Sequence, residues 1–226
     1  MKFVPFVLLA AAAVFFSAQT STYAQSTVFT AYVVASGAKG DQNLSCCPQT
    51  LGMDFNVNQS INVVSLGVFD SGGDGLAGST AAHIFDRDTQ KVVATLQFSH
   101  ADPGILVGGS RFKLLALPLT LAAGFHGSIV VDYLSSPVEP NGNRGNNRPN
   151  APWSTDTGGG LISFVGGGRI GRSGNPNDFP TEPDGGPADR YAAGTFQYTP
   201  VPEPAAVALL ALGCLGIAPV FTRRTR

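Results

Sequence analysis

This chain of 226 residues contains few of the residue types that build most catalytic and metal-binding sites. It has three cysteines, three histidines and one tryptophan, and only 13% of its residues are charged. Between residues 25 and 200, glutamate occurs only as Glu139 and Glu182. The motifs of serine hydrolases, zinc proteases and phosphate-binding loops are missing, and a glycosidase would have to use aspartates alone. These absences predict that the protein is not an enzyme; the alternative is a secreted hydrolase of unrecognised type.

Cysteine is too sparse for a disulfide framework. Cys214 lies in an apolar run near the C-terminus, whereas Cys46 and Cys47 are adjacent and precede Pro48. A zinc site needs further ligands at suitable spacing, and no other cysteine is available. Two interpretations stay open for Cys46 and Cys47: a strained vicinal disulfide formed in an oxidising compartment, or two free thiols.

An excess of positive charge is also missing from the central part of the chain. Without Lys2 and the three terminal arginines, ten of the 14 Lys and Arg remain, and without Glu203, fourteen of the 15 Asp and Glu remain. Residues 25–200 therefore carry a net charge of about −4. Because nucleic-acid-binding domains are usually basic over one face, we expect no nucleic-acid partner.

Helical periodicity is absent from residues 25–200, and short β-branched and aromatic runs recur there instead. Gly, Asn, Asp and Pro separate these runs, which is typical of an all-β sandwich or barrel. The predicted strands cover residues 28–35, 51–57, 61–69, 80–86, 91–98, 111–117, 128–134, 161–165 and 194–198. The expected fold is one all-β domain, an antiparallel two-sheet sandwich that is jelly-roll-like.

Alternation within the runs predicts one buried and one solvated face for each strand. Met53, Phe55 and Val57 share one face of their strand, and Asp54 and Asn56 share the other. This pattern suits an antiparallel sheet that packs on a core with one side only.

Turn residues and long irregular stretches connect the predicted strands. Asn58 and Gln59 separate two runs and predict a tight hairpin turn. Residues 137–160 and 166–190 are rich in Pro, Asn, Gly and Arg and predict two long loops. Loops of this length in a compact domain are usually functional or disordered.

The first 24 residues have the features of a secretory signal peptide. Lys2 supplies a positive start, residues 4–16 form an apolar core, and Thr22-Tyr23-Ala24 forms a small-residue cleavage site. We therefore expect export, an N-terminal signal helix in the precursor, and removal of residues 1–24 by signal peptidase.

Three features follow one another near the C-terminus: a Pro-Glu-Pro triplet, an uncharged apolar run and a basic tail. They comprise Pro202, Glu203, Pro204, residues 205–221, Arg223, Arg224 and Arg226. As a helix, the run would be about 25 Å long, close to the thickness of a hydrocarbon core of about 30 Å. The arginines would keep the C-terminus in the cytoplasm.

In this order, the three features resemble a PEP-CTERM sorting signal over residues 201–226, the substrate tag of the bacterial exosortase system. The resemblance implies a transmembrane helix at 205–221 that anchors the protein in the inner membrane during transit. It also implies cleavage by an exosortase-type sorting protease and release to the cell surface or exterior. The alternative interpretation is an ordinary C-terminal membrane anchor.

The central domain resembles the DUF4082 type, a β-sandwich domain of unknown function found in bacterial surface proteins. The similar segments are residues 51–57, 64–76, 83–86 and 117–124, and residues 184–196 are similar to the closing segment of many PEP-CTERM proteins. The resemblance implies an architecture and a location. It brings no catalytic residues, because none are established for the family.

A glycine-rich segment between two predicted strands is the first candidate site. Asp70 and Asp74 flank Ser71-Gly72-Gly73, and Ca²⁺ prefers oxygen ligands, some of them carbonyls from a flexible backbone. The alternative is a plain turn, in which glycine supplies positive φ and aspartate forms local hydrogen bonds. No other cofactor is expected.

The single tryptophan is the second candidate. Trp153 lies in the first long stretch near Arg144, Arg148 and Asp156. An exposed indole can stack on a sugar while charged side chains hold its hydroxyl groups, so this group predicts a glycan-binding site that uses residues 137–160 and 166–190. The alternative is that Trp153 folds back as an apolar plug.

The three histidines would form a site only if they converged in space. His83 has the same parity as Phe85, which predicts a buried histidine with its hydrogen bonds satisfied. His100 and His126 lie in turn-like sequence.

Together these features predict an exported, non-enzymatic protein with a structural or adhesive role in exopolysaccharide or biofilm matrix, a role implied by the resemblance alone. The expected partners are signal peptidase, the sorting protease, the membrane until processing, and polysaccharide.

Overall fold

A computed structural model describes residues 27–40, 50–133, 153–171 and 178–202, and these form an all-β, antiparallel structure without helices. The predicted fold class is thereby confirmed for this part of the chain. The predicted signal helix, the helix at 205–221, Cys46, Cys47 and Cys214 lie outside the described residues.

The first sheet has five strands in the order β1-β13-β4-β8-β7. Their bounds are β1 Phe29–Thr30, β13 Gly194–Pro200, β4 Ile61–Phe69, β8 Ser110–Leu121 and β7 Ile105–Val107. Neighbouring strands pair antiparallel throughout.

The second sheet has six strands in the order β12-β11-β3-β9-β5-β6. Their bounds are β12 Glu182–Asp184, β11 Ile162–Gly171, β3 Thr50–Val57, β9 His126–Tyr133, β5 Thr80–Asp86 and β6 Lys91–Phe98. A separate pair joins β2 (Tyr32–Val34) to β10 (Trp153–Thr155). All nine predicted runs contain strands, and β7, β10 and β12 are strands that the sequence pattern did not predict.

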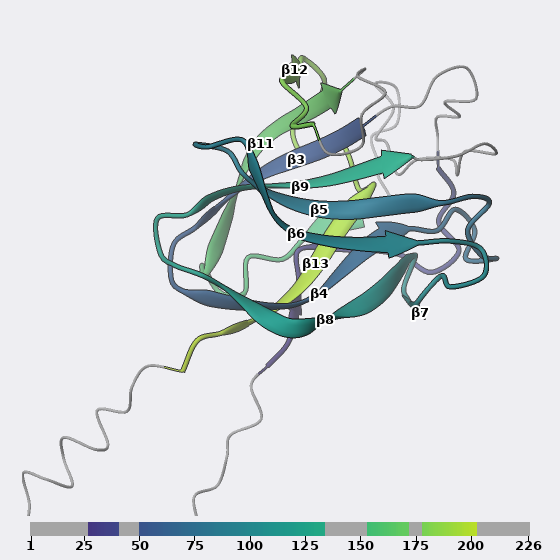
Figure 1. Cartoon of the computed structure of the whole chain (residues 1–226), viewed down its shortest axis with the longest axis horizontal. Coiled ribbons are helices and arrows are strands. Elements are labelled where there is room, and N and C mark those ends of the chain that lie inside the picture. Colours follow the sequence, from purple (N-terminus) through teal and green to yellow (C-terminus); the bar gives the residue numbers. More distant parts are fainter. Residues whose placement is uncertain (1–26, 41–49, 134–152, 172–177, 203–226) are drawn as a thin grey trace, which may run out of the picture.

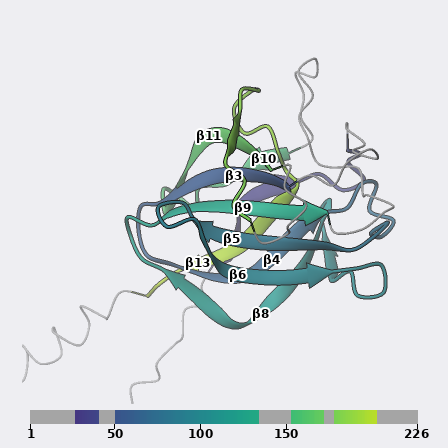
Figure 2. The same cartoon turned by 45° about the horizontal axis from the view of Figure 1, so that its top comes forward.

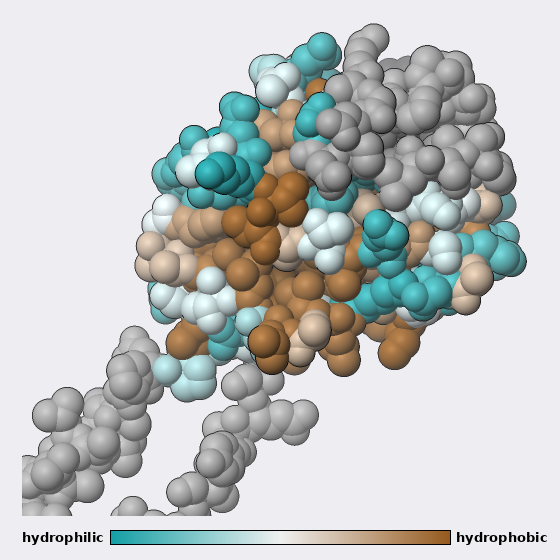
Figure 3. Space-filling view, in the orientation of Figure 1, coloured by the Kyte–Doolittle hydropathy of each residue, from teal (hydrophilic) through white to brown (hydrophobic). Residues whose placement is uncertain are grey.

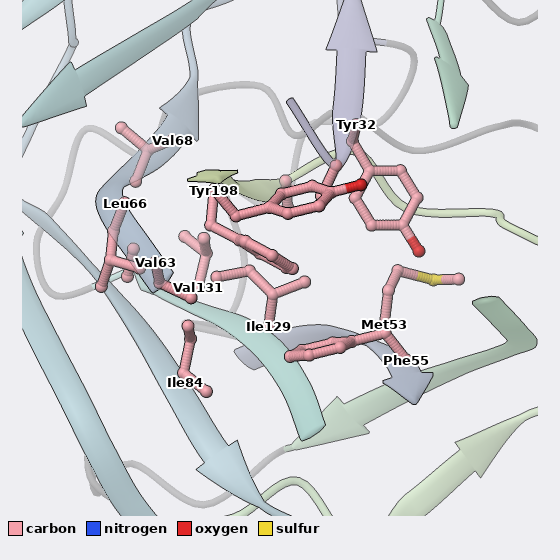
Figure 4. Packing of buried hydrophobic residues seen from close by; sticks show 14 of the residues in the cluster. Tyr32, Met53, Phe55, Val63, Leu66, Val68, Ile84, Ile129, Val131 and Tyr198 are labelled. Carbon is pink, nitrogen blue, oxygen red and sulfur yellow. The ribbon is translucent and has the colours of Figure 1, made fainter. Parts of the chain in front are cut away.

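The two large sheets face each other across the core, and β9, β5 and β6 lie over β4 and β13 in both views of the cartoon (Figures 1 and 2). Met53, Phe55 and Val57 point into this core as predicted, each at most 2% exposed. Figure 4 shows how side chains from both sheets interdigitate, with Phe55 beneath Tyr198. The ring of Phe55 also lies 4.8 Å from that of Phe196, centroid to centroid. Burial of these large aromatic side chains is the main force that holds the sheets together.

The turn at Asn58 and Gln59 is not the hairpin that was predicted. It connects β3 to β4, which belong to different sheets and do not pair. The backbone N–H groups of Asn58 and Gln59 both donate to the carbonyl oxygen of Leu161, at 2.8 and 3.1 Å. The segment is therefore a corner, where the chain crosses from one sheet to the other.

The two predicted long loops are partly wrong, because β10 lies within residues 137–160, and β12 and the end of β11 lie within 166–190. The sequence pattern ended this strand at residue 165 because glycines follow, but β11 continues to Gly171. The strand passes a bulge between Phe164 and Gly168, where Gly166 has φ of +79°. A Cβ on Gly168 would lie 2.9 Å from the ring of Tyr191. These glycines therefore shape a strand and do not end it.

Both ends of the described chain leave the sandwich at the same end of the domain. Phe29 pairs with Tyr198, and Pro200 pairs with Ile61 just after the corner, so residues 27–29 and 200–202 are neighbours (Figure 1). We call this the terminal end. Strand β4 starts at the terminal end and finishes at Phe69, and β9 likewise finishes at Tyr133. We call the end of the domain that contains Phe69 and Tyr133 the distal end.

Candidate functional site

The candidate calcium ligands lie at the distal end, after β4, where Asp70 is completely buried. Arg111 Nε donates to Asp70 Oδ2 at 2.6 Å, and the backbone N–H of Gly75 donates to the same oxygen at 3.2 Å. Gly72, Gly73 and Gly75 all have positive φ, and Asp74 is exposed. The carboxylate of Asp70 thus has a guanidinium partner and holds the turn together. These contacts are those of the plain turn that was the alternative to a calcium site.

We predict that calcium does not stabilise the protein. A ligand that binds only the native state raises the melting temperature, and the carboxylate of Asp70 is already paired with the guanidinium of Arg111 at 2.6 Å. Thermal melting in excess calcium and in excess chelator should give the same midpoint within error. A midpoint that is several degrees higher in calcium, and that Asp74→Ala abolishes, would contradict this prediction.

Trp153 is partly buried at the distal end of β10 and packs against a small apolar cluster. The cluster consists of Val34, Ala38, Phe69 and Ala192. The indole N–H donates to the carbonyl oxygen of Asp189 at 3.2 Å. The contacts of Trp153 are therefore those of an apolar plug.

Of the other members of the predicted glycan site, only Asp156 lies in the part of the chain that the structure describes. Asp156 lies beyond β10 toward the terminal end, and its carboxylate accepts a hydrogen bond from the backbone N–H of Gly158 at 2.8 Å. Arg144 and Arg148 lie outside the described residues. The structure thus gives the position of two of the four predicted residues.

The histidines do not converge. His83 is 1% exposed in β5, His100 Nδ1 lies 3.1 Å from the carbonyl oxygen of Leu76, and His126 pairs with Asp88 at the terminal end. In the described part of the chain, no three His, Cys, Asp or Glu side chains lie close enough to share a metal ion.

The sequence pattern missed a buried ionic cluster around Asp54. Asp54 was predicted on a solvated face but is only 5% exposed. Arg169 Nε donates to both of its oxygens, at 2.8 and 3.0 Å, and Arg87 Nη1 lies 3.5 Å from Oδ2. The second face of β3 is therefore covered, and two cations surround one carboxylate there.

Aromatic side chains cover this cluster. The guanidinium of Arg169 lies 4.8 Å from the ring centroid of Phe179, and that ring meets Phe85 edge to face at 5.5 Å. The segment that follows residue 177 thus packs on the outer face of the second sheet. No motif indicates this, because Arg169 and Phe179 lie in stretches whose glycine and proline content predicted loops.

His83 extends the polar layer along the same face of the sheet. Its Nδ1 lies 2.8 Å from the hydroxyl of Thr95, and its Nε2 lies 3.1 Å from Asp132 Oδ2, although this contact is not aligned as a hydrogen bond. The predicted burial of His83 is confirmed, but the predicted satisfaction of its hydrogen bonds is wrong for Nε2, which has no aligned partner. Its partners come from β6 and β9, strands whose register cannot be read from the sequence.

Two buried tyrosines act as hydrogen-bond donors. Burial, together with the Asp156 charge, raises the pKa of Tyr198 far above its ordinary value, and its hydroxyl donates to the Asp156 carbonyl oxygen at 2.8 Å. Burial and the hydrogen bond to Asp184 raise the pKa of Tyr191 in the same way. Both hydroxyls remain protonated at neutral pH and serve the structure.

An apolar groove of about 390 Å³ lies on the outer face of the first sheet, along β7 and β8. Ile105, Val107, Phe112 and Leu114 line it, and its floor includes Ser65. Phe112 can lie flat on β4 because Gly67 is beneath it, where a Cβ would approach the ring to 2.7 Å. The sequence pattern predicted neither β7 nor this groove.

No known family model and no curated protein sequence matches this chain. Among the described residues, no helix is long and apolar enough to cross a membrane. The apolar run at 205–221 is outside those residues.

Proposed function

We propose that this chain is an exported, non-enzymatic protein that a sorting protease processes and that acts at the cell surface or in the extracellular matrix. The observation that carries the proposal is the C-terminal series of Pro202-Glu203-Pro204, apolar run and arginines. Its similarity to PEP-CTERM signals, and that of the central domain to DUF4082 domains, provide the biological context. A jelly-roll arrangement of the sandwich, the two terminal helices and a role in polysaccharide matrix belong to the same proposal.

The position of the last strand supports processing near Pro202. The backbone N–H of Val201 donates to the Ser60 carbonyl oxygen at 3.1 Å, and Pro202, one residue later, is exposed. Val201 and Pro202 lie outside any strand, so the sheet ends before the triplet begins. Cleavage at the triplet would leave the sandwich intact.

The common exit of both ends at the terminal end supports temporary anchoring. A domain held by its N-terminal signal, its C-terminal helix, or both would have this end toward the membrane. The distal end, with Trp153 and the Asp70 turn, would then point away from the bilayer. This orientation suits a protein that displays its loops to the exterior.

The test is to express the full chain in a bacterium with an exosortase-type protease and in the same strain without it. We expect the first strain to release protein that begins after Ala24 and ends near Pro202, as read by mass spectrometry of both termini. The second should retain the tail in the inner membrane. Replacing Arg223, Arg224 and Arg226 with glutamine is the control that should impair retention and sorting. Full-length protein in the cytosol, with Met1 still present, would disprove the proposal.

The second candidate function is a glycan-binding module that uses Trp153. What favours it is the location of Trp153 at the distal end, where it is only partly buried. Against it, the indole N–H of Trp153 already donates to the Asp189 carbonyl oxygen, and the ring packs on apolar side chains, so less of it is available to stack on a sugar. A glycan array with Trp153→Ala as the comparison separates this candidate from a purely structural role.

A further inference from the structure

We infer that the terminal end of the domain lies on the lipid headgroups of the membrane for as long as the C-terminal tail is inserted. The inference rests on the proposed function, in which residues 205–221 anchor the chain before processing. Three segments make the contact: the corner at residues 57–60 and the turns at 122–125 and 157–161. We call them the exit surface.

Hydrogen bonds join the three segments of the exit surface to one another and to the end of β13. The backbone N–H of Val201 donates to the Ser60 carbonyl oxygen at 3.1 Å, and the Ser60 hydroxyl oxygen accepts from the N–H of Ala123 at 3.3 Å. The side-chain amide of Asn58 donates to the Gly160 carbonyl oxygen at 3.1 Å. The chain therefore leaves the domain from within this surface.

The connection to the tail is too short to hold the exit surface away from a bilayer. Val201 is still bonded to the domain, and the apolar run begins four residues later at Ala205. Four extended residues span at most about 14 Å, and the headgroup layer takes up about 5–8 Å of this distance. The exit surface is therefore at most about 9 Å beyond the headgroups. Any bend in these four residues brings it into contact.

The exit surface and the strand ends beside it carry no charged side chain, although residues 25–200 have a net charge of about −4. No Asp, Glu, Lys or Arg occurs in residues 57–61, 122–125, 157–163 and 199–202. In Figure 3, pale and brown residues predominate at the lower left, where both ends of the described chain leave the domain. Anionic lipids repel carboxylates within a screening length of about 8 Å. An acidic domain thus meets the bilayer with an uncharged end.

Charges at the edge of the exit surface are balanced or held by the backbone. The β5–β6 turn lies at this end, because Asp86 pairs with Gly127 near the start of β9. Residues 86–91 contain two carboxylates and two cations. The carboxylate of Asp156 accepts a hydrogen bond from the N–H of Gly158 at 2.8 Å. Neither group adds an excess of one sign beside the bilayer that is large enough to oppose the tether.

The side chains of the exit surface favour lipid over a protein partner such as the sorting protease. Asn58 and Gln59 are exposed, as are the small residues 122–124. Amide groups donate and accept hydrogen bonds without charge, which suits headgroup oxygens. Protein interfaces depend mainly on Trp, Tyr and Arg anchors, and none of these occurs in the three segments.

The experiment is photo-crosslinking to lipid in cells that express the full chain and lack the sorting protease, so that the tail is retained. A photoreactive residue replaces Gln59 in one strain and Gln97 in another. Both glutamines are exposed, and Gln97 lies near the distal end of β6. We expect at least about tenfold more phospholipid adduct from position 59, because position 97 is about 20 Å farther along its strand. Mass spectrometry of the intact chain identifies the adducts.

A longer connection tests the length argument directly. Inserting about ten Gly and Ser residues after Val201 leaves the triplet and the apolar run unchanged and adds about 17 Å of reach. Adducts from position 59 should then fall about fivefold or more, since the domain is no longer held at the headgroups. The fraction of chain in the membrane should stay the same, and protease resistance checks that each variant is folded.

The two ways of failing are separate. A chain that is missing from the membrane fraction would overturn the proposed function together with this inference. A chain that is anchored in the membrane would overturn only the inference in any of three cases: no lipid adduct or chiefly protein adducts at position 59, equal lipid yields from the two positions, or an unchanged yield from the lengthened chain.

Discussion

Asp54→Ala should lower the free energy of unfolding by about 3–5 kcal/mol, because it removes the one carboxylate between two largely buried cations. The side chains of Arg169 and Arg87 are 21% and 17% exposed, so they cannot regain full hydration after the substitution. The measurement is urea denaturation of the processed protein at neutral pH. A loss of this size is a large fraction of the total stability of an ordinary domain.

Asp88→Ala is the matched control for this prediction. Asp88 also contacts a side-chain nitrogen, since its Oδ2 lies 3.1 Å from His126 Nδ1, but its side chain is 67% exposed. Exposed pairs contribute about 0–1 kcal/mol, so this variant should be nearly as stable as the parent. If the two aspartate variants lost the same stability, Asp54 would not be the centre of a buried ionic cluster.

A second substitution separates lost charge pairing from lost packing. In the Asp54→Ala background, Arg169→Met should recover part of the loss, because it removes a cation that has lost its partner and keeps much of the side-chain volume. Alone, Arg169→Met should be destabilising, since it breaks the hydrogen bonds at 2.8 and 3.0 Å. The coupling energy between these two sites should therefore be large and favourable.

The Asp54 cluster also shows where sequence reasoning about this fold succeeds and fails. Alternation placed Met53 and Phe55 in the core correctly, because the period of a strand fixes which residues share a face. It could not show that the opposite face is also covered. That covering comes from Arg169 and Phe179, more than a hundred residues later, and only the pairing of β11 with β3 brings them to Asp54.

The same limit applies to the candidate sites. The strand runs follow from local composition, so most of them could be predicted. The corner at Asn58 could not, because a short polar turn is the same whether it joins paired strands or crosses between sheets. The partners of Asp70 and His83 also come from distant strands, in Arg111 and Asp132. The sequence therefore identified charged and polar residues that could form a site, but it could not show which of them are already paired with each other in the fold.

Gly127→Ala should destabilise the protein by about 1–3 kcal/mol through overpacking. Gly127 lies opposite Phe55 in the pairing of β9 with β3, and a Cβ there would come within 2.2 Å of the Phe55 ring. That ring is fully buried and packs against Phe196, so it can move only by disturbing the contact between the two sheets. Urea denaturation should show a lower midpoint with an unchanged slope.

Gly167→Ala is the control, because it adds the same methyl group to another strand where no atom lies within 4 Å of the new Cβ. It should change stability by less than about 0.5 kcal/mol. Combining Gly127→Ala with Phe55→Leu tests the mechanism, since the smaller side chain leaves room for the methyl group. The double variant should lose less stability than the two single losses together, as coupled neighbours do. Strict additivity would mean that Gly127 is required for backbone conformation and not for the close approach of Phe55, and the glycine would then need a different explanation.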